Sequence, residues 1–293
     1  MVLKNGQLLL EFRAQLSSEN LDIELSNIES LSRLSKLFEK ILKKKNRGDQ
    51  ILIALKPPIR PNISIPLAFK VLMGFEAKLR KKNLSAIFYI CSNEIVDYLY
   101  RYMPKDLIPT SQCEIANVVI IFKIADIVEV SADAIVNTSN CELKLGGGVS
   151  GSIRKSANPN AQLILNRIAS NKPLKNGDAI LTDALGIQRI RHIIHVAAVA
   201  GTEQVLRKSL QNILKICEDK SIRTVAIPAI GTGTGGLAME TCAKIFQEEL
   251  TRHFTNILNT KIEKVMIVLW KKSDYDVFEK VFRLQPSQVT QVI

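Results

Sequence analysis

Apolar residues along the chain fall into two patterns, short continuous runs and longer stretches with helical spacing. The runs at residues 50–55, 84–91 and 116–124 are short and mostly apolar, which predicts buried strands. Between residues 27 and 45 the apolar positions recur every three or four residues, which predicts an amphipathic helix that ends in a lysine run. This alternation of strands and helices predicts an α/β protein with mostly parallel sheets.

Prolines mark the predicted boundary between two domains. Pro104 and Pro109 punctuate the segment 104–111, which we interpret as a linker. A chain of 293 residues, of which 46% are hydrophobic, has enough apolar material for two cores. We therefore predict domains at residues 1–110 and 113–285.

The N-terminal domain carries one recognisable succession of elements. Within residues 67–109 a helix, an apolar strand, a helix capped by Ser92 or Asn93, and the turn at Pro109 follow one another. This order resembles the STAS domain, the small regulatory module of anti-anti-sigma factors and anion-transporter tails. The resemblance implies a small α/β domain and a regulatory protein as its partner.

Net charge is the unusual bulk property, at +12 for pH 7. A basic surface favours anionic partners such as nucleotides or nucleic acid. The lysine clusters lack interleaved aromatic residues, so we do not expect a dedicated nucleic-acid face. Five scattered cysteines and three histidines show no metal-ligand spacing, so we expect neither a metal site nor a cofactor.

Targeting signals are not evident in the sequence. No apolar run reaches the roughly 18–20 residues that span a membrane, and the first residues do not resemble a secretory signal. We therefore expect a cytoplasmic protein with no membrane contact.

Two glycine-rich loops carry the candidate chemistry. In the first, a strand at residues 132–137 leads to Gly146, Gly147 and Gly148 and then to a helix. In the second, a strand at 224–227 leads to residues 229–236 and a helix that starts near Met239. Glycines let backbone N–H groups approach an anion, and each helix N-terminus adds partial positive charge.

The positions of these loops predict a shared ligand. Both follow strands, and ligands of open α/β sheets bind at the carboxyl ends of the strands. The two loops can therefore enclose one diphosphate from both sides. The pattern lacks the acidic residue of a dinucleotide-binding Rossmann fingerprint and the lysine of a P-loop, so neither site is predicted.

The residues around both loops resemble the signature of the macrodomain family. The matching segments are 133–140 with 145–153, 193–195, 227–236 and 267–275, in the family's order. The resemblance implies a three-layer α/β/α sandwich with a mixed, mostly parallel sheet. It also implies a cleft for ADP-ribose or an ADP-ribosylated protein.

Carried over by position, the resemblance assigns a role to each site residue. Asp126 and the backbone of Ile127 would bind adenine, and Asn140 would bind the distal ribose and serve catalysis in an enzyme. Pro228 and Trp270 would flank the adenine, although Trp270 could instead be a core residue. The remaining residues would wrap the distal ribose and the phosphates: Gly146, Gly147, Gly148, Val149, Ser150, Ile153, Gly231, Thr232, Gly233, Thr234 and Gly235.

The sequence is compatible with three hypotheses for function, and only one of them includes catalysis. Many macrodomain hydrolases have an aspartate where this chain has Ser150, and several have an aromatic residue where it has Gly235. One hypothesis is a slow ADP-ribosyl hydrolase in which the substrate and the loop backbone position water. Another is a non-catalytic reader coupled to the N-terminal domain, and a third is an RNA-binding protein.

Overall fold

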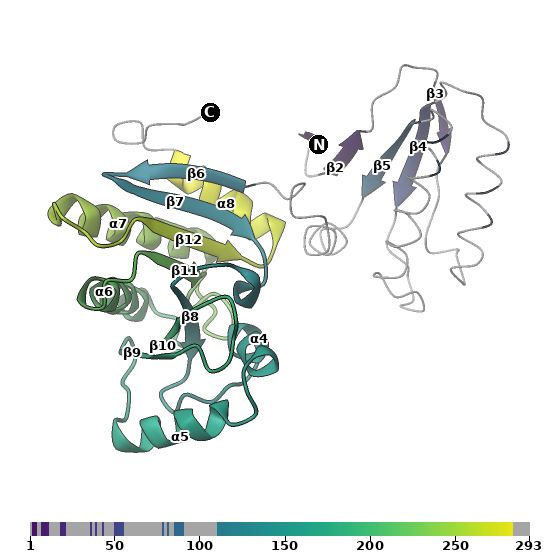
Figure 1. Cartoon of the computed structure of the whole chain (residues 1–293). Helices are drawn as coiled ribbons and strands as arrows, with labels where there is room; N and C mark the ends of the chain where they lie inside the picture. Colours follow the sequence, from purple (N-terminus) through teal and green to yellow (C-terminus); the bar gives the residue numbers. More distant parts are fainter. Residues whose placement is uncertain are drawn as a thin grey trace. The chain divides into compact units, whose positions relative to one another are not determined.

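The computed structural model describes residues 110–283 without a gap (Figure 1). Towards the N-terminus it describes residues 2–4, 7–11, 18–21, 36, 39, 43, 50–55, 78, 81 and 85–90. The chain divides into two compact units, Met1–Tyr102 and Met103–Ile293.

The N-terminal unit contains a five-stranded sheet. Its strand order is β1 (Val2–Lys4), β2 (Gln7–Glu11), β5 (Ser85–Ile90), β4 (Gln50–Leu55) and β3 (Ser18–Leu21). Strands β3, β4 and β5 run parallel, whereas β1 and β2 are antiparallel to their neighbours. The strands predicted at 50–55 and 84–91 are confirmed, while the STAS likeness stays a prediction.

The C-terminal unit is built on a seven-stranded mixed sheet. Its order is β6 (Thr110–Ile115), β7 (Val118–Ile124), β12 (Lys264–Leu269), β11 (Thr224–Pro228), β8 (Ala134–Ser139), β10 (His192–Ala197) and β9 (Ala179–Asp183). The five inner strands are parallel and the two edge strands are antiparallel. The mixed, mostly parallel sheet is therefore confirmed.

Strand β6 corrects one detail of the sequence prediction. Thr110 and Ser111, which we expected in the linker, begin β6 and pair with Lys123 and Phe122. The strand's polar sequence disguised it, because an edge strand buries only part of its side chains and needs no continuous apolar run.

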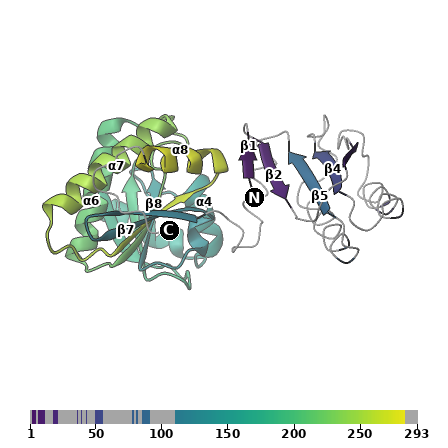
Figure 2. The same cartoon turned by 90° about the horizontal axis from the view of Figure 1, so that it is seen from above.

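Helices cover both faces of this sheet, which confirms the three-layer arrangement (Figure 2). Helices α6 (Glu203–Asp219), α7 (Met239–Asn256) and α8 (Lys272–Arg283) lie on one face, where Phe122 and Phe282 pack edge to face. Helices α4 (Gly148–Ser156) and α5 (Ala161–Asn171) and the short helix η3 (Ile127–Glu129) cover the other face. Among the described residues, no helix has both the length and the apolar character to cross a membrane.

Strands β8 and β11 are joined at their amino ends and part towards their carboxyl ends. They pair only at Ala134 and Ile135, whereas β8 and β10 pair along their whole length. At the amino end, Asp133 Oδ2 accepts hydrogen bonds from Thr224 N (2.9 Å) and Arg223 N (3.2 Å). Strands β8 and β11 are therefore held together at their amino ends and separated at their carboxyl ends.

Candidate functional site

The carboxyl edge of the sheet gathers the predicted site residues from four parallel strands. Asp126 and Ile127 follow β7, Asn140 and the first glycine loop follow β8, the second glycine loop follows β11, and Trp270 follows β12. Segments far apart in the sequence therefore meet at one edge, as expected for an open α/β sheet.

The first glycine loop presents a free helix N-terminus. Backbone N–H groups of residues 147–150 find no acceptor within residues 110–283, and Gly147 caps α4 without a side-chain hydrogen bond. A Cβ on Gly146, Gly147 or Gly148 would have no neighbour within 4 Å. Unpaired N–H groups at the positive end of a helix dipole, beside open space, are suited to bind an anion.

Side chains from the following helices fix the path of this loop. Gln162 Oε1 accepts from Leu145 N at 2.8 Å, and Arg154 Nη1 donates to Leu145 O at 3.2 Å. The backbone donors are therefore held in place before a ligand arrives, which lowers the entropic cost of binding.

The second glycine loop presents a similar row of donors. It is folded on itself by bonds from Leu237 N to Gly231 O (3.0 Å) and from Gly236 N to Gly233 O (3.1 Å). Backbone N–H groups of residues 232–235 donate to no acceptor in the continuous described segment. Because the two loops follow β8 and β11, which part here, the two rows of donors lie on either side of the gap.

Asp126 is held at the β7 end of this edge. The half-buried carboxylate accepts from Ser152 Oγ at 2.8 Å and from Val128 N at 3.3 Å. Ser152 lies on α4, so the carboxylate is oriented relative to the first anion site. A fixed carboxylate is a specific acceptor for an amine donor.

Asn140 directly follows β8, and the two ends of its carboxamide have different surroundings. Its Oδ1 accepts from Lys144 N at 2.9 Å and so turns the first loop. Its Nδ2 makes no hydrogen bond to any residue of 110–283. The donor half of this side chain is thus available to a ligand.

Pro228 and Trp270 differ in their exposure. Trp270 is 43% exposed, which does not fit the alternative of a core residue. Pro228 is buried at the end of β11, opposite Val268. The indole ring therefore offers a ligand much more surface than the proline does.

Three predicted site residues turn their side chains into the core. Ile127 and Ile153 are 3% and 0% exposed, and Ser150 is 4% exposed. Only the backbone of these residues can serve a ligand. For Ser150 this means that the hydroxyl points into the core and not into the cleft.

The Ser150 hydroxyl instead begins a buried chain of polar side chains. It donates to Asn137 Oδ1 at 2.8 Å, and Asn137 Nδ2 lies 3.1 Å from His195 Nδ1. His195 Nε2 lies 3.1 Å from Thr182 Oγ1 on the edge strand β9. The chain ties the first turn of α4 to three strands of the sheet.

His195 must be neutral for this chain to exist. Burial lowers its pKa to about 4, so the ring is uncharged at pH 7. Asn137 Nδ2 can only donate, so Nδ1 of His195 accepts and Nε2–H donates to Thr182. Each member of the chain then has a matched donor and acceptor.

Acid is expected to destabilise the protein through His195. The unfolded state takes up a proton near pH 6.5 and the folded state only near pH 4, so stability is full above pH 6.5 and falls as pH drops towards 4. The expected loss of unfolding free energy between pH 7 and 5 is about 2 kcal/mol. Urea unfolding at both pH values measures it.

The matched variants for this prediction are His195→Gln and His192→Gln. His195→Gln removes the titrating ring and should flatten the pH dependence between pH 7 and 5, whereas His192→Gln, on the opposite face of β10, should not. An unchanged pH dependence in His195→Gln would contradict the assignment.

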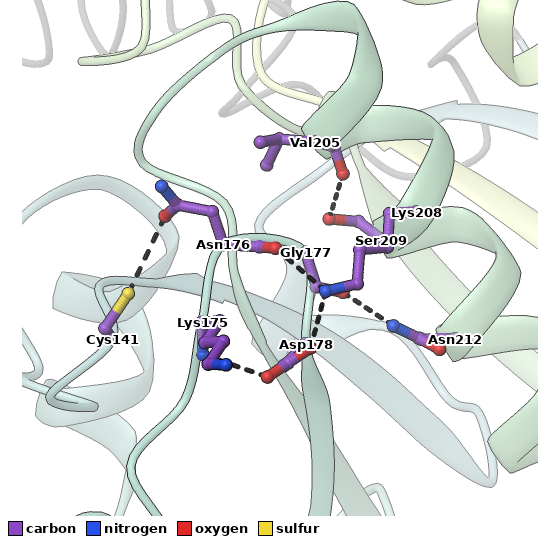
Figure 3. A network of polar contacts seen from close by, with 9 residues as sticks. All are labelled: Cys141, Lys175, Asn176, Gly177, Asp178, Val205, Lys208, Ser209 and Asn212. Atoms are coloured by element: carbon purple, nitrogen blue, oxygen red, sulfur yellow. Dashed lines mark hydrogen bonds and ion pairs between the residues drawn. The ribbon is translucent and has the colours of Figure 1, made fainter.

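A polar cluster braces the rim of the site beside Asn140 (Figure 3). Lys208 Nζ on α6 donates to Asp178 Oδ1 at 2.8 Å and to Asn176 O at 3.3 Å. The hydrogen bond from Lys208 is the main cause that lowers the pKa of Asp178. Cys141, directly after Asn140, contacts Asn176 Oδ1 at 3.6 Å, so this cluster supports the start of the first loop.

One contributor was not predicted from the sequence, the turn at residues 198–202 between β10 and α6. Its Gly201 has φ +53°, and a Cβ there would lie 2.1 Å from Gly235 O in the second loop. A glycine between an apolar strand and Thr202, which caps α6, was the available signal. The signal was missed because a single glycine does not reveal its partner.

Comparison with known proteins is consistent with this geometry. The Macro domain family model matches residues 136–246. The O-acetyl-ADP-ribose deacetylase 1 of Pantoea vagans is 32% identical over 166 residues, covering 53% of this chain and 94% of that protein. No other part of the chain is covered by the family model.

Solved structures share the fold. The Oceanobacillus iheyensis macrodomain with ADP is 23% identical with a TM-score of 0.56, covering 60% of this chain and 95% of its own. The Trypanosoma brucei macrodomain in complex with ADP-ribose is 22% identical with a TM-score of 0.51, covering 56% and 68%.

Proposed function

The chain belongs to the Macro domain family, and on that premise we propose that its C-terminal unit binds ADP-ribose, free or attached to a protein. The observation that carries the proposal is the pair of donor rows at residues 147–150 and 232–235, on either side of the gap between β8 and β11. Relatives described as bound to ADP and ADP-ribose support the choice of ligand.

The diphosphate takes the gap between the two loops. Its oxygens accept from backbone N–H groups on both sides, and the N-terminus of α4 favours its negative charge. Backbone donors cannot lose a proton or swing away, so they suit a group that carries its charge at every physiological pH.

The adenosine extends from the diphosphate towards Asp126 and Trp270. The carboxylate of Asp126, fixed by Ser152, accepts from the exocyclic amine of adenine. The exposed face of Trp270 stacks on the base. Adenine recognition then depends on one acceptor and one aromatic surface.

The distal ribose extends in the other direction, towards Asn140. Its hydroxyls accept from Nδ2 of Asn140, the half of the carboxamide that makes no bond within residues 110–283. Because Oδ1 is held by Lys144 N, the orientation of the donor is set by the loop.

Recognition is favoured over rapid turnover. Ser150 cannot serve as a general base, because its hydroxyl is buried and donates to Asn137. Slow hydrolysis of an ADP-ribosyl or acyl bond is the second candidate, favoured by Asn140 and by the name of the Pantoea vagans relative. It would use water positioned by the substrate phosphate and the loop backbone.

A reader of ADP-ribose would pass its signal through the rest of the chain. The N-terminal unit, with its STAS-like order of elements, would carry that signal to a regulatory protein. Pull-down with the full chain, with and without ADP-ribose, would show whether partner capture responds to the ligand.

Calorimetric titration with ADP-ribose tests the binding site. Wild type should bind, and Asp126→Ala should weaken binding about tenfold or more, since a hydrogen bond to a charged group is worth about 1.5–3 kcal/mol. Glu129→Ala is the matched control, because Glu129 is an exposed acid in the same short helix. Equal affinities for wild type and Asp126→Ala would show that the adenine site lies elsewhere.

Incubation with a mono-ADP-ribosylated protein separates the two candidates. Release of ADP-ribose over hours that is lost in Asn140→Ala would establish a slow hydrolase. Binding of ADP-ribose without release would establish a reader.

A further inference from the structure

The turn at residues 198–202 crosses the end of β8 and connects it to the second glycine loop. At its start, Ala198 N donates to Ser139 O at 3.0 Å, beside Asn140. At its other end, Gly201 lies against Gly235 and Gly231 of the second loop. Because β8 lies between β10 and β11, a turn that leaves β10 and reaches the loop after β11 spans the carboxyl end of β8.

The backbones of Gly201 and Gly235 pack directly against each other, with no room for a side chain on either residue. A Cβ on Gly201 would lie 2.1 Å from Gly235 O, and a Cβ on Gly235 would lie 2.6 Å from Gly201 Cα. These distances are shorter than any van der Waals contact, and neither neighbour is a flexible side chain. Position 235 therefore has no room for a side chain, and the turn packs directly on the backbone of the second loop.

Val199 is the large hydrophobic residue of this turn. It is 44% exposed, and it is one of five large hydrophobic residues exposed within the described part of the chain. It lies between Ala198, which is bonded beside Asn140, and Gly201, which is packed on the second loop. The residue therefore lies between the end of β8, beside Asn140, and the second glycine loop, and its side chain is exposed there.

We propose that Val199 packs against the distal ribose and determines the preference for ADP-ribose over ADP. The inference rests on the proposed function, because it uses the ligand orientation in which Asn140 marks the ribose end. ADP shares the adenosine and the diphosphate with ADP-ribose and lacks only the distal ribose. The apolar C–H surface of that sugar is the part of the ligand that gains from burial against valine.

The test is the ratio of the ADP and ADP-ribose dissociation constants, measured by calorimetry on the full chain. Val199→Ala removes two methyl groups and should weaken ADP-ribose about threefold to fivefold while ADP changes less than twofold. Val199→Trp adds a much larger ring at the position proposed to contact the ribose. It should weaken ADP-ribose about tenfold or more, again with ADP changed less than twofold.

Leu258→Ala and Leu258→Trp are the matched controls. Leu258 is 91% exposed and follows α7, whose C-terminal end leads back to the amino end of β12, away from the site. Both controls should leave the ratio at its wild-type value. Thermal melting of all four variants shows whether the fold is intact.

The outcomes distinguish this inference from the proposed function. If wild type binds both nucleotides and the Val199 variants leave the ratio within twofold of wild type, the role of Val199 is overturned and the binding site stands. If the variants weaken ADP and ADP-ribose equally, Val199 acts on the whole site and the specificity proposal is overturned. If wild type binds neither nucleotide, the proposed function and the inference fall together.

Discussion

Gly147→Asp is expected to remove ADP-ribose binding while the protein melts at the same or a higher temperature. Gly147 caps α4 with an extended backbone, and a Cβ there would have no neighbour within 4 Å, so the substitution fits. The new carboxylate would accept from the free N–H groups of α4, a cap worth about 1 kcal/mol of stability. It would also occupy the position of the diphosphate and repel the negative phosphate groups. We therefore expect the affinity for ADP-ribose to fall about a hundredfold or more.

Gly147→Ala is the control for the expected loss of ADP-ribose affinity without loss of thermal stability. It adds the same Cβ without the charge and should change ADP-ribose affinity by only a few-fold. Calorimetry and thermal melting on the three proteins provide both measurements. Retention of tight binding by Gly147→Asp would mean that the N-terminus of α4 is not the phosphate site.

Gly201→Ala is expected to destabilise the protein by about 3 kcal/mol or more and to impair binding of both ADP and ADP-ribose. The added Cβ would lie 2.1 Å from Gly235 O, and overpacking typically costs about 1–3 kcal/mol. The left-handed backbone at φ +53° adds about 1 kcal/mol for a residue with a side chain. The clash can be relieved only if the second loop moves. That loop carries half of the backbone N–H groups proposed to bind the diphosphate.

Gly236→Ala separates the two causes. Gly236 has φ +71° in the same loop, but a Cβ there would meet nothing within 4 Å. It should therefore cost only the backbone strain, about 1 kcal/mol. Urea unfolding of both variants compares these costs, and equal destabilisation would show that the contact between Gly201 and Gly235 contributes nothing.

Much of the fold could be predicted because its helices and strands are encoded in short stretches of sequence. The mostly apolar runs at 50–55 and 116–124 proved to be strands, with the second starting at Val118. The helix after the second glycine loop begins at Met239, as its sequence predicts. Strand β6 was hidden because its polar sequence is typical of a linker until a partner strand is present.

The candidate site was predictable in its position and less so in its chemistry. Both glycine loops follow parallel strands, so their meeting at one edge follows from topology alone. The direction of each side chain does not. Ser150 is polar and lies between Val149 and Gly151 in a glycine-rich loop, yet its hydroxyl is buried against Asn137 on β8.

The alternation of strands and helices, the two glycine-rich loops and the family can all be inferred from the sequence. These features depend on periodicity and on residues that are close along the chain, where backbone conformation is encoded. The separation of β8 and β11 at their carboxyl ends and the packing of Gly201 against Gly235 are evident only in the three-dimensional structure. Such contacts join segments distant in sequence, and their geometry is set by the packing of the whole sheet. The glycine loops thus supply the donors, whereas the strands and the turn around them fix where a ligand can lie.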